Sequence, residues 1–454
     1  MNTRDDLRGT KDSSNKLAIR MTISLILALA VGTVLIFLRE YLIESGNASL
    51  WAQINRIFFV DISTEEGTNG FGIFYILGQL FINALQFIIV PMVFSSIALA
   101  MCRISDTKKL GRISYKTLLG FLTTSIFALI TAGTIGYLVY KMGLFNVALE
   151  GNASVEVASR QNPLMVILDA VPNNIFSVFT SNGRVLAVVF LAVVIGLCIN
   201  TGGEEIVVLK KILLDINKVV NVFLNFVIIK FSPVAVFILI TRTFAVYGIE
   251  HLKPALVYIL TTCGTAILYL IIAYPLYVFL VARLNPFIFM KKIAKVALLA
   301  FSANSSAAAL SLNERTTVGD LGVDKDIASF ILPLGMTINM NGTAITQVIA
   351  TIFIAASSGY SLEYKNIVVI AVLALIASVG TPAAPGASAI ILFSVLNSMG
   401  YNNPATIIAY SLIIAINRPV DMVTTSLNVT GDAATAVVVA ASEGSLDKKV
   451  YYNE

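Results

Sequence analysis

Long apolar runs are the feature that most constrains what this chain can fold into. Several approach or exceed the roughly 20 residues that a helix needs to cross a bilayer core, among them residues 25–38, 74–101, 118–140, 185–199, 219–240 and 256–281. The chain is 57% hydrophobic and 13% charged, with a mean hydropathy of +0.86. One soluble core cannot bury that much apolar surface. We therefore expect an all-α integral membrane protein.

The basic residues predict the orientation of this protein in the membrane. They cluster before the first run and in the link after the second, at Arg4, Arg8, Lys11, Lys16, Arg20, Arg103, Lys108, Lys109, Arg112 and Lys116. The link 39–72 has only Arg39 and Arg56. By the positive-inside bias, the N-terminus and the 102–116 link are cytoplasmic. Lys448 and Lys449 predict a cytoplasmic C-terminus and an even number of spans. No small-residue cleavage pattern follows the first run, so we expect an anchored helix and not a removed signal peptide.

Other function classes find little support in the sequence. The basic residues lie where membrane topology needs them, so nucleic-acid binding is not predicted. The three cysteines, Cys102, Cys198 and Cys263, are isolated in or beside apolar segments and suggest neither disulfides nor a metal site. No Gly-rich phosphate loop or nucleophile-and-base arrangement occurs, so we do not expect an enzyme. His251, the single histidine, is better explained as a solvated loop residue than as a proton relay.

Two apolar segments after residue 284 are interrupted by small polar residues. The first, 286–312, has Ser302-Ala303-Asn304-Ser305-Ser306 at its centre, and the second, 368–399, has a Gly-, Thr- and Pro-rich centre at 378–388. A helix break inside lipid leaves backbone groups unpaired, so it persists only when buried in protein or lining a cavity. We predict two re-entrant hairpins at a transporter's binding site. A pair of kinked spanning helices is the alternative.

Between these segments, Asn339-Met340-Asn341-Gly342-Thr343 interrupts the apolar run 331–356. Gly342 would permit an unwound turn. The amide, hydroxyl and freed carbonyl oxygens would then suit a weakly bound alkali cation. Polar helix packing through Asn and Thr is the alternative interpretation.

The last apolar segment, roughly 404–441, carries polar residues at helical spacing. Asp421, Thr425, Asn428 and Asp432 follow a 4-3-4 pattern, which places them on one helical face. Ionisable residues within a membrane are costly and usually functional. An ion pair between Arg418 and Asp421 would account for two of the charges structurally but not for Asp432. We therefore predict a ligand-facing stripe.

These segments carry a family resemblance. Ser305-Ser306, Asn339 through Thr343, Val379-Gly380-Thr381 through Pro385-Gly386, and Asp421 through Asn428-Val429-Thr430-Gly431-Asp432 occur in this order. Together they resemble the glutamate/neutral amino acid transporter family, the dicarboxylate/amino acid:cation symporters. The resemblance extends from about residue 75 to 440. The site residues are most similar to those of the neutral amino acid members.

The resemblance implies a fold and an assembly. We expect eight transmembrane helices and two re-entrant helical hairpins, built from inverted repeats, in a homotrimer in the bacterial inner membrane. Residues 21–113 and 144–247 would form a scaffold. Residues 114–143 and 248–443 would form an elevator-type transport domain, with the second hairpin as its extracellular gate. Residues 1–20 and 444–454 would be cytoplasmic tails.

The resemblance also implies roles for individual residues. The substrate would contact Ser306, Thr343, Ala384 to Ser388, Asp421, Thr424, Thr425 and Asn428. Asp421 would hold its α-ammonium group, while hairpin N–H groups and the Asn428 amide would hold its α-carboxylate. One sodium site would use Gly335, Asn339, Asn428 and Asp432. A second would use Thr337, Ser378, Val379 and Thr381.

Three departures from the family pattern modify these expectations. Thr424 stands where members that transport acidic amino acids have Arg, so a substrate's side-chain carboxylate would lack its bidentate partner. Asn341 stands where the family has Asp, and Phe121 where a Tyr is expected. A third cation site built with Thr124 and Ser125 would therefore be weakened or absent. Asn417-Arg418 replaces an Asp and its neighbour, and our hypothesis is that Arg418 supplies a fixed positive charge that partly substitutes for the missing cation.

The sequence thus predicts a secondary active transporter that imports a small neutral amino acid of the Ala/Ser/Thr type with a cation, most simply sodium. Uptake of aspartate, another dicarboxylate or cystine, with altered or proton coupling, is the alternative within this class. A substrate-gated anion channel is the alternative from another class.

Overall fold

The structure is a computed structural model and describes residues 3–63, 67–102, 108–145, 171–180, 184–247, 252–379, 381 and 386–452. Helices dominate these ranges. Within them, the single extended pairing is an isolated antiparallel bridge between Val323 and Leu446. The predicted all-α class is therefore confirmed for the described part of the chain.

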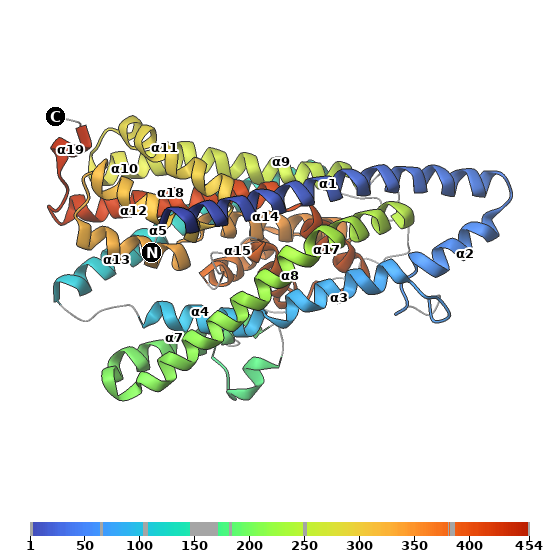
Figure 1. The fold of residues 1–454 in the computed structure, drawn as a ribbon, viewed down its shortest axis with the longest axis horizontal. Helices are drawn as coiled ribbons and strands as arrows, with labels where there is room; N and C mark the ends of the chain where they lie inside the picture. The colour runs from blue at the N-terminus through green and yellow to red at the C-terminus, as the bar shows by residue number, and fades with distance from the viewer. Residues whose placement is uncertain are drawn as a thin grey trace.

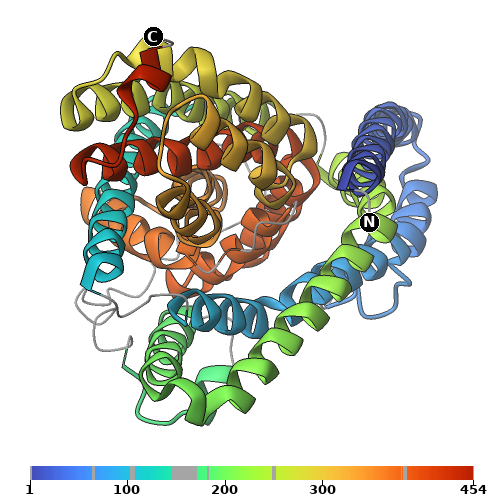
Figure 2. The same ribbon diagram turned by 60° about the vertical axis from the view of Figure 1, so that its left-hand side comes forward.

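The N-terminal half supplies long helices that lie beside the rest of the molecule (Figures 1 and 2). Helix α1 packs along α8, and α4 packs against both α7 and α8. The elements of this half are α1 (Thr3–Glu44), α2 (Ala48–Phe58), α3 (Ile73–Phe87), α4 (Ile89–Met101), α5 (Lys108–Lys141), η1 (Phe176–Phe179), α7 (Val185–Gly202), η3 (Gly203–Ile206) and α8 (Val207–Tyr247).

The C-terminal half folds into a compact bundle, drawn yellow to red in Figure 2. Helices α14 and α18 lie inside it and are buried along almost their whole length. Helix α5 joins this bundle by packing on α14. The elements are α9 (Leu252–Leu268), the π-helical turn η5 (Tyr269–Ala273), α10 (Tyr274–Ala282), α11 (Pro286–Ala303), α12 (Ser306–Gly319), α13 (Lys325–Ile338), α14 (Asn341–Ser357), α15 (Tyr364–Val379), α16 (Ala387–Ser398), α17 (Pro404–Ile416), α18 (Arg418–Ser442) and α19 (Lys448–Tyr452).

Several helices are long and apolar enough to cross a membrane. Five segments in the described ranges satisfy this criterion, and the bent pair α17–α18 would make a sixth. A multi-pass membrane protein follows from these lengths. The expected total of eight spans stays a prediction.

Both interrupted segments contain two successive helices. In the first hairpin, α11 ends where Asn304 adopts a left-handed conformation (φ 47°), and Ser305 caps α12 by accepting from the Ala308 N–H. The second hairpin consists of α15 and α16, with Gly386 (φ 80°) before the first turn of α16. Residues 380 and 382–385 between its arms, and with them the predicted site residue Ala384, lie outside the described residues, as does His251.

Two helical segments differ from the form that was predicted from the sequence. The segment 404–441 is not one straight helix, because α17 and α18 meet at an angle of 68°. Pro419, in the first turn of α18, lacks the N–H that a continuous helix would need there. The unwound turn in the 331–356 segment lies at Asn339 and Met340, whereas Gly342 is helical in the first turn of α14.

The end of the chain is held against the base of the first hairpin. Lys292 of α11 donates to the carbonyls of Asp320, Val450 and Tyr451 at 2.7–2.9 Å. The buried Tyr451 donates its hydroxyl proton to the Asn285 carbonyl at 2.8 Å. These contacts hold α19 against the two ends of the hairpin where the chain enters and leaves it. The tip, at Asn304 and Ser305, lies at the opposite end of α11.

Glu443, just after α18, provides a pH-dependent link to α5. Hydrogen bonds from Arg112 and then Lys116 lower the pKa of Glu443 from 4.5 to about 2. A carboxyl group with a lowered pKa stabilises the fold above its unfolded pKa, and this contribution disappears as the pH falls from about 4.5 to about 2.

We expect Glu443→Gln to lower the thermal unfolding temperature at pH 7 and to reduce the decrease of this temperature between pH 5 and 3. The exposed Asp215–Lys218 pair supplies the control, since Asp215→Asn should change neither value. Equal behaviour of the two variants would contradict this role.

Candidate functional site

Helix α18 forms one wall of the candidate site. Its buried Asp421, Asn428 and Asp432 and half-buried Thr425 lie on one face, as their spacing predicts. The Asp421 carboxylate accepts from the Ser388 hydroxyl of the second hairpin and from Asn417 Nδ2 at 2.8 Å. Tyr258 of α9 orients Asn417 by donating to its side-chain oxygen at 2.6 Å. Three helices thus hold one buried carboxylate in place.

The cavity beside this carboxylate is where three helices begin. Its lining includes Ser305 and Ser306 at the start of α12, Met340 before α14, and Gly386 before α16. Helix N-termini carry unpaired N–H groups and a partial positive charge, which favour an anionic group. The arrangement suits a carboxylate at one end of a ligand and a cationic group beside Asp421.

The cavity gathers most of the predicted substrate residues. They are Ser306, Thr343, Ser388, Asp421, Thr424, Thr425 and Asn428, and Asn304 and Thr381 also line it. Its volume is about 30 Å³, on the order of one water molecule. The walls must separate before an amino acid can enter.

Asn304, which the sequence reading did not assign to the substrate site, links the first hairpin to α18. Its amide is best oriented with the oxygen accepting from Arg418 Nη1 at 3.0 Å, and the nitrogen donating to Thr425 Oγ1 at 3.1 Å and to the Asp421 carbonyl at 3.0 Å. The sequence did offer one signal, an Asn between two helical segments, because Asn can adopt the left-handed conformation that often ends a helix. Its partners depend on the tertiary fold.

The break between α13 and α14 lies against Asp432. Asn339 Nδ2 donates to Asp432 Oδ1 at 2.9 Å, and a Cβ atom at Gly335 would lie 2.4 Å from the same oxygen. Asn339 Oδ1 is buried with no hydrogen-bond partner among the described residues. No Lys or Arg in the described part of the chain pairs with Asp432. A buried carboxylate beside an unpaired amide oxygen fits a monovalent cation. Of the residues predicted for the first ion site, Gly335, Asn339 and Asp432 lie together, whereas Asn428 bonds to the Gly342 N–H and contacts Met340 Sδ.

The predicted second ion site lies near two helix C-termini. Helix α13 ends one residue after Thr337, and α15 ends at Val379, one residue after Ser378. These helices pack together, and helix C-termini present carbonyl oxygens with a partial negative charge. Thr337, Ser378 and Thr381 each donate their hydroxyl proton to a carbonyl of the preceding turn, so their oxygens can still face a cation.

The predicted third ion site is occupied by a neutral hydrogen-bond network. Ser125 donates to Asn341 Oδ1 at 2.6 Å, and Asn341 Nδ2 donates to the Tyr274 hydroxyl at 3.0 Å. Tyr269 donates to the Thr124 carbonyl at 2.6 Å, and its ring packs edge-on against Tyr274 at 5.4 Å. Both ends of the Asn341 amide are therefore satisfied without a cation.

Tyr269 and Tyr274 were missed because their position depends on the π-helical turn η5. Such turns are rare and often occur at functional sites, but an apolar sequence does not reveal them. Two tyrosines five residues apart in an apolar run were the available signal.

Arg418 does not reach the third site. It lies at the start of α18, roughly 20 Å along the helix from Gly431, and Gly431 is the residue that Tyr274 approaches.

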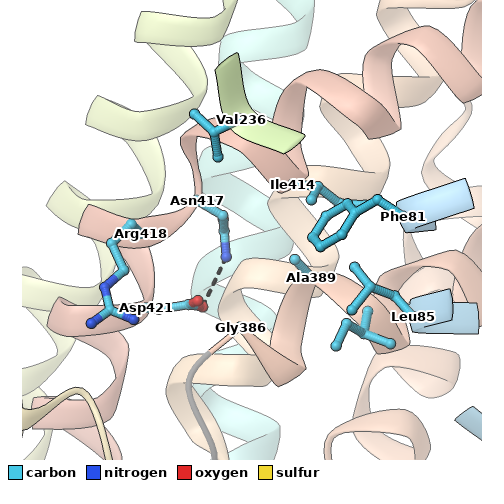
Figure 3. Close-up of a pocket in the computed structure, with 10 residues that line it drawn as sticks. Phe81, Leu85, Val236, Gly386, Ala389, Ile414, Asn417, Arg418 and Asp421 are labelled. Atoms are coloured by element: carbon cyan, nitrogen blue, oxygen red, sulfur yellow. Dashed lines mark hydrogen bonds between the residues drawn. The ribbon is translucent and has the colours of Figure 1, made fainter. Parts of the chain in front are cut away.

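Figure 3 shows a second cavity, of about 40 Å³, where Phe81 and Leu85 of α3 and Val236 of α8 face Asn417 and Asp421. The Arg418 guanidinium points away from those apolar side chains. No Arg418–Asp421 ion pair within 4 Å occurs in the described residues.

Comparison with known proteins yields one family and a set of relatives. Residues 17–442 match the model of the sodium:dicarboxylate symporter family. The chain is 29% identical to the proton/glutamate-aspartate symporter of Escherichia coli, covering 82% of this chain and 86% of the relative. It is 27% identical to a C4-dicarboxylate transport protein of Rhodopseudomonas palustris (82% and 82%) and to the proton/sodium-glutamate symport protein of Geobacillus stearothermophilus (82% and 88%).

The close approach of α14 to α18 predicts a strong effect at Gly342. A Cβ atom there would lie 2.5 Å from the Thr424 carbonyl oxygen and 2.8 Å from its Cα, so the backbones must separate. We expect Gly342→Ala to cost about 1–3 kcal/mol by overpacking and to weaken substrate binding. Gly264→Ala in α9, where the added Cβ meets no atom within 4 Å, should be neutral or slightly stabilising. Thermal unfolding in detergent compares the two, and equal unfolding temperatures would show that the close approach is dispensable.

Proposed function

The chain belongs to the sodium:dicarboxylate symporter family, a family of cation-coupled membrane transporters, and we propose that it imports a small neutral amino acid of the Ala/Ser/Thr type with sodium. The observation that carries the substrate class is the charge of the cavity. Among the described residues that line it, Asp421 alone is ionisable. A zwitterionic amino acid can pair its ammonium group with Asp421 and direct its carboxylate to the helix N-termini.

The same charge argument disfavours the substrates named for the relatives. A C4-dicarboxylate has no ammonium group and would place negative charge beside Asp421. Glutamate or aspartate would carry a second carboxylate toward Thr424, which offers a hydroxyl and no cation. Each would bury a charge without a partner, which costs several kcal/mol.

Sodium is proposed as the coupling ion on the basis of two oxygen-rich places. Asp432 and the unpaired Asn339 oxygen form one, and the C-terminal turns of α13 and α15, which carry Thr337 and Ser378, would form the other. A cation at Asp432 would neutralise a carboxylate that is 3% exposed. The ion would thereby hold the α13–α14 break against α18 and prepare the substrate cavity.

The proposed movement follows the expected domains. Residues 114–143 and 248–443 would move as one transport domain against a scaffold of residues 21–113 and 144–247, in a homotrimer in the bacterial inner membrane with both termini cytoplasmic. The packing of α5 on α14 supports the inclusion of the 114–143 segment in the moving part.

Arg418 supports a second candidate, an acidic amino acid. Its Nη1 donates to the Asn304 side-chain oxygen, and its buried Nε has no hydrogen-bond partner among the described residues. A turn of the Asn304 side chain would expose this charge to a substrate carboxylate. Aspartate is the runner-up for this reason.

Uptake of a labelled amino acid panel into proteoliposomes tests the substrate class. We expect serine uptake driven by an inward sodium gradient, competed by alanine and threonine but weakly by aspartate.

Thr424→Arg should shift the aspartate-to-serine preference on the order of tenfold, or about 1.4 kcal/mol, because it supplies a bidentate partner. Asp421→Asn should abolish uptake of both. Strong aspartate uptake by the wild type, uncompeted by serine, would overturn the proposal, and dependence on a proton gradient alone would overturn its sodium coupling.

The neutral Ser125–Asn341–Tyr274 network predicts reduced cation coupling. Asn341→Asp places a carboxylate between two hydroxyl groups at a position with no solvent exposure, where a cation would be its best partner. We expect steeper sodium dependence of uptake, with a higher Hill coefficient and more sodium per substrate, as measured by flux ratios. Ser125→Ala in the Asn341→Asp background should reverse part of the gain. An unchanged stoichiometry in Asn341→Asp would show that the third site is not limited by the missing carboxylate.

A further inference from the structure

An apolar groove lies between α5 and the first arm of the second hairpin. Its volume is about 250 Å³. Two antiparallel helical stripes line it, Ile126, Leu129, Ile130, Gly133 and Thr134 from α5, and Tyr364, Ile367, Val368, Ala371, Val372 and Leu375 from α15. Gly133 brings the helices together at one end, since a Cβ atom there would lie 3.0 Å from Ile367. Ile130, Val368 and Val372 remain exposed by 58%, 51% and 44%.

The mouth of the groove differs chemically from its interior. Tyr137 and Tyr364 meet edge-on, with ring centroids 6.3 Å apart. Lys141, in the last turn of α5, lies 5.3 Å from the Tyr137 ring centroid and 5.9 Å from that of Tyr140. Tyrosines and a lysine at the end of a membrane helix mark the headgroup region of a bilayer. The groove therefore has an anion-attracting mouth and an apolar interior.

The dimensions of the groove match one leaflet. Helix α5 is a candidate span from Gly111 to Lys141. The lining from Thr134 to Ile126 covers about 12 Å of helix and begins roughly 10 Å from Lys141. Half of a bilayer core is about 15 Å thick. The lining offers water few hydrogen-bond partners, so an apolar occupant suits the groove better.

We propose that this groove is a phospholipid site, in which one acyl chain lies between α5 and α15 and the headgroup phosphate pairs with Lys141. The acyl chain of the lipid would contribute the apolar contacts that the exposed Ile130, Val368 and Val372 otherwise lack. Lys141 gives a preference for anionic headgroups.

A lipid bound in the groove would influence the ion and substrate sites through α15. Leu375, at the inner end of the groove, precedes Ser378 by one turn, and Ser378 donates to the Leu375 carbonyl at 2.8 Å. An acyl chain that fills the groove restrains this arm, so the lipid acts on the second hairpin rather than on the substrate directly. This step does not depend on which amino acid is carried.

Native mass spectrometry of the full chain in mild detergent tests the site. We expect wild type to retain one tightly bound phospholipid per protomer, with phosphatidylglycerol preferred over phosphatidylcholine. Ala371→Phe fills the groove and should lower this occupancy on the order of tenfold. Leu119→Phe, at an exposed position of α5 (49%) beyond the groove, should retain the lipid. Lys141→Gln should retain a lipid but lose the preference for phosphatidylglycerol.

Two outcomes overturn the proposal. Equal phospholipid retention by wild type, Ala371→Phe and Leu119→Phe would mean that only annular lipid is bound or that protein covers the groove. Retention that is absent in wild type would exclude the site directly. Unfolding temperatures of the variants and, should Ala371→Phe fold poorly, the smaller Ala371→Leu keep lipid loss distinct from misfolding. Lipid counting needs no transport, so it can fail while the proposed function holds, and the reverse.

Discussion

The helix break at Asn339 and Met340 is the constraint on which the rest of the site depends. Two residues leave the helical conformation inside a segment that is otherwise buried, and backbone polar groups there cannot reach water. Helix α18 resolves part of this cost. Asn428 Oδ1 accepts from the Gly342 backbone N–H at 2.7 Å, and Asp432 Oδ1 fixes the side chain at the break by accepting from Asn339 Nδ2. Since α18 must lie close enough to serve the break, Gly335 and Gly342 have no side chain in the space that it occupies.

The broken elements separate charge without using many charged side chains. The starts of α12, α14 and α16 border the substrate cavity through Ser306, Met340 and Gly386, while the C-terminal turns of α13 and α15 carry residues proposed for the second ion site. Helix dipoles therefore favour an anionic group on one side and a cation on the other. Only Asp421 and Asp432 add full charges on the ligand-facing side of α18. The cavity can thus hold a zwitterion whose net charge is zero, while the buried Asp432 carboxylate keeps its need for a cation.

The sequence predicted the presence of the breaks better than their positions. Polar residues in apolar runs located both hairpins and the 339–343 segment, because unpaired backbone groups in lipid need such residues nearby. The unwound turn was placed at Gly342, whereas it lies at Asn339 and Met340; the glycine serves helix contact instead. The bend at Asn417 was not expected, although Pro419 was a local signal. Tyr274 and Asn304 were missed because their partners, Asn341 and Arg418, are distant in sequence and meet them only through the tertiary fold.

The two hairpins are restrained differently, which bears on which of them can move. The first is held at its base by Lys292 and Tyr451, and at its tip by Asn304, which bonds to the start of α18. A displacement of its tip would break hydrogen bonds at Arg418 and Thr425 together. The second hairpin hydrogen-bonds to the site through Ser388, and its first arm packs on α14 but borders the apolar groove on the side of α5. Moving α15 into or away from that groove exchanges mainly apolar contacts along the arm, and its buried Ser378 lies only at the far end. The energetically easier opening of the closed cavity is therefore through the second hairpin.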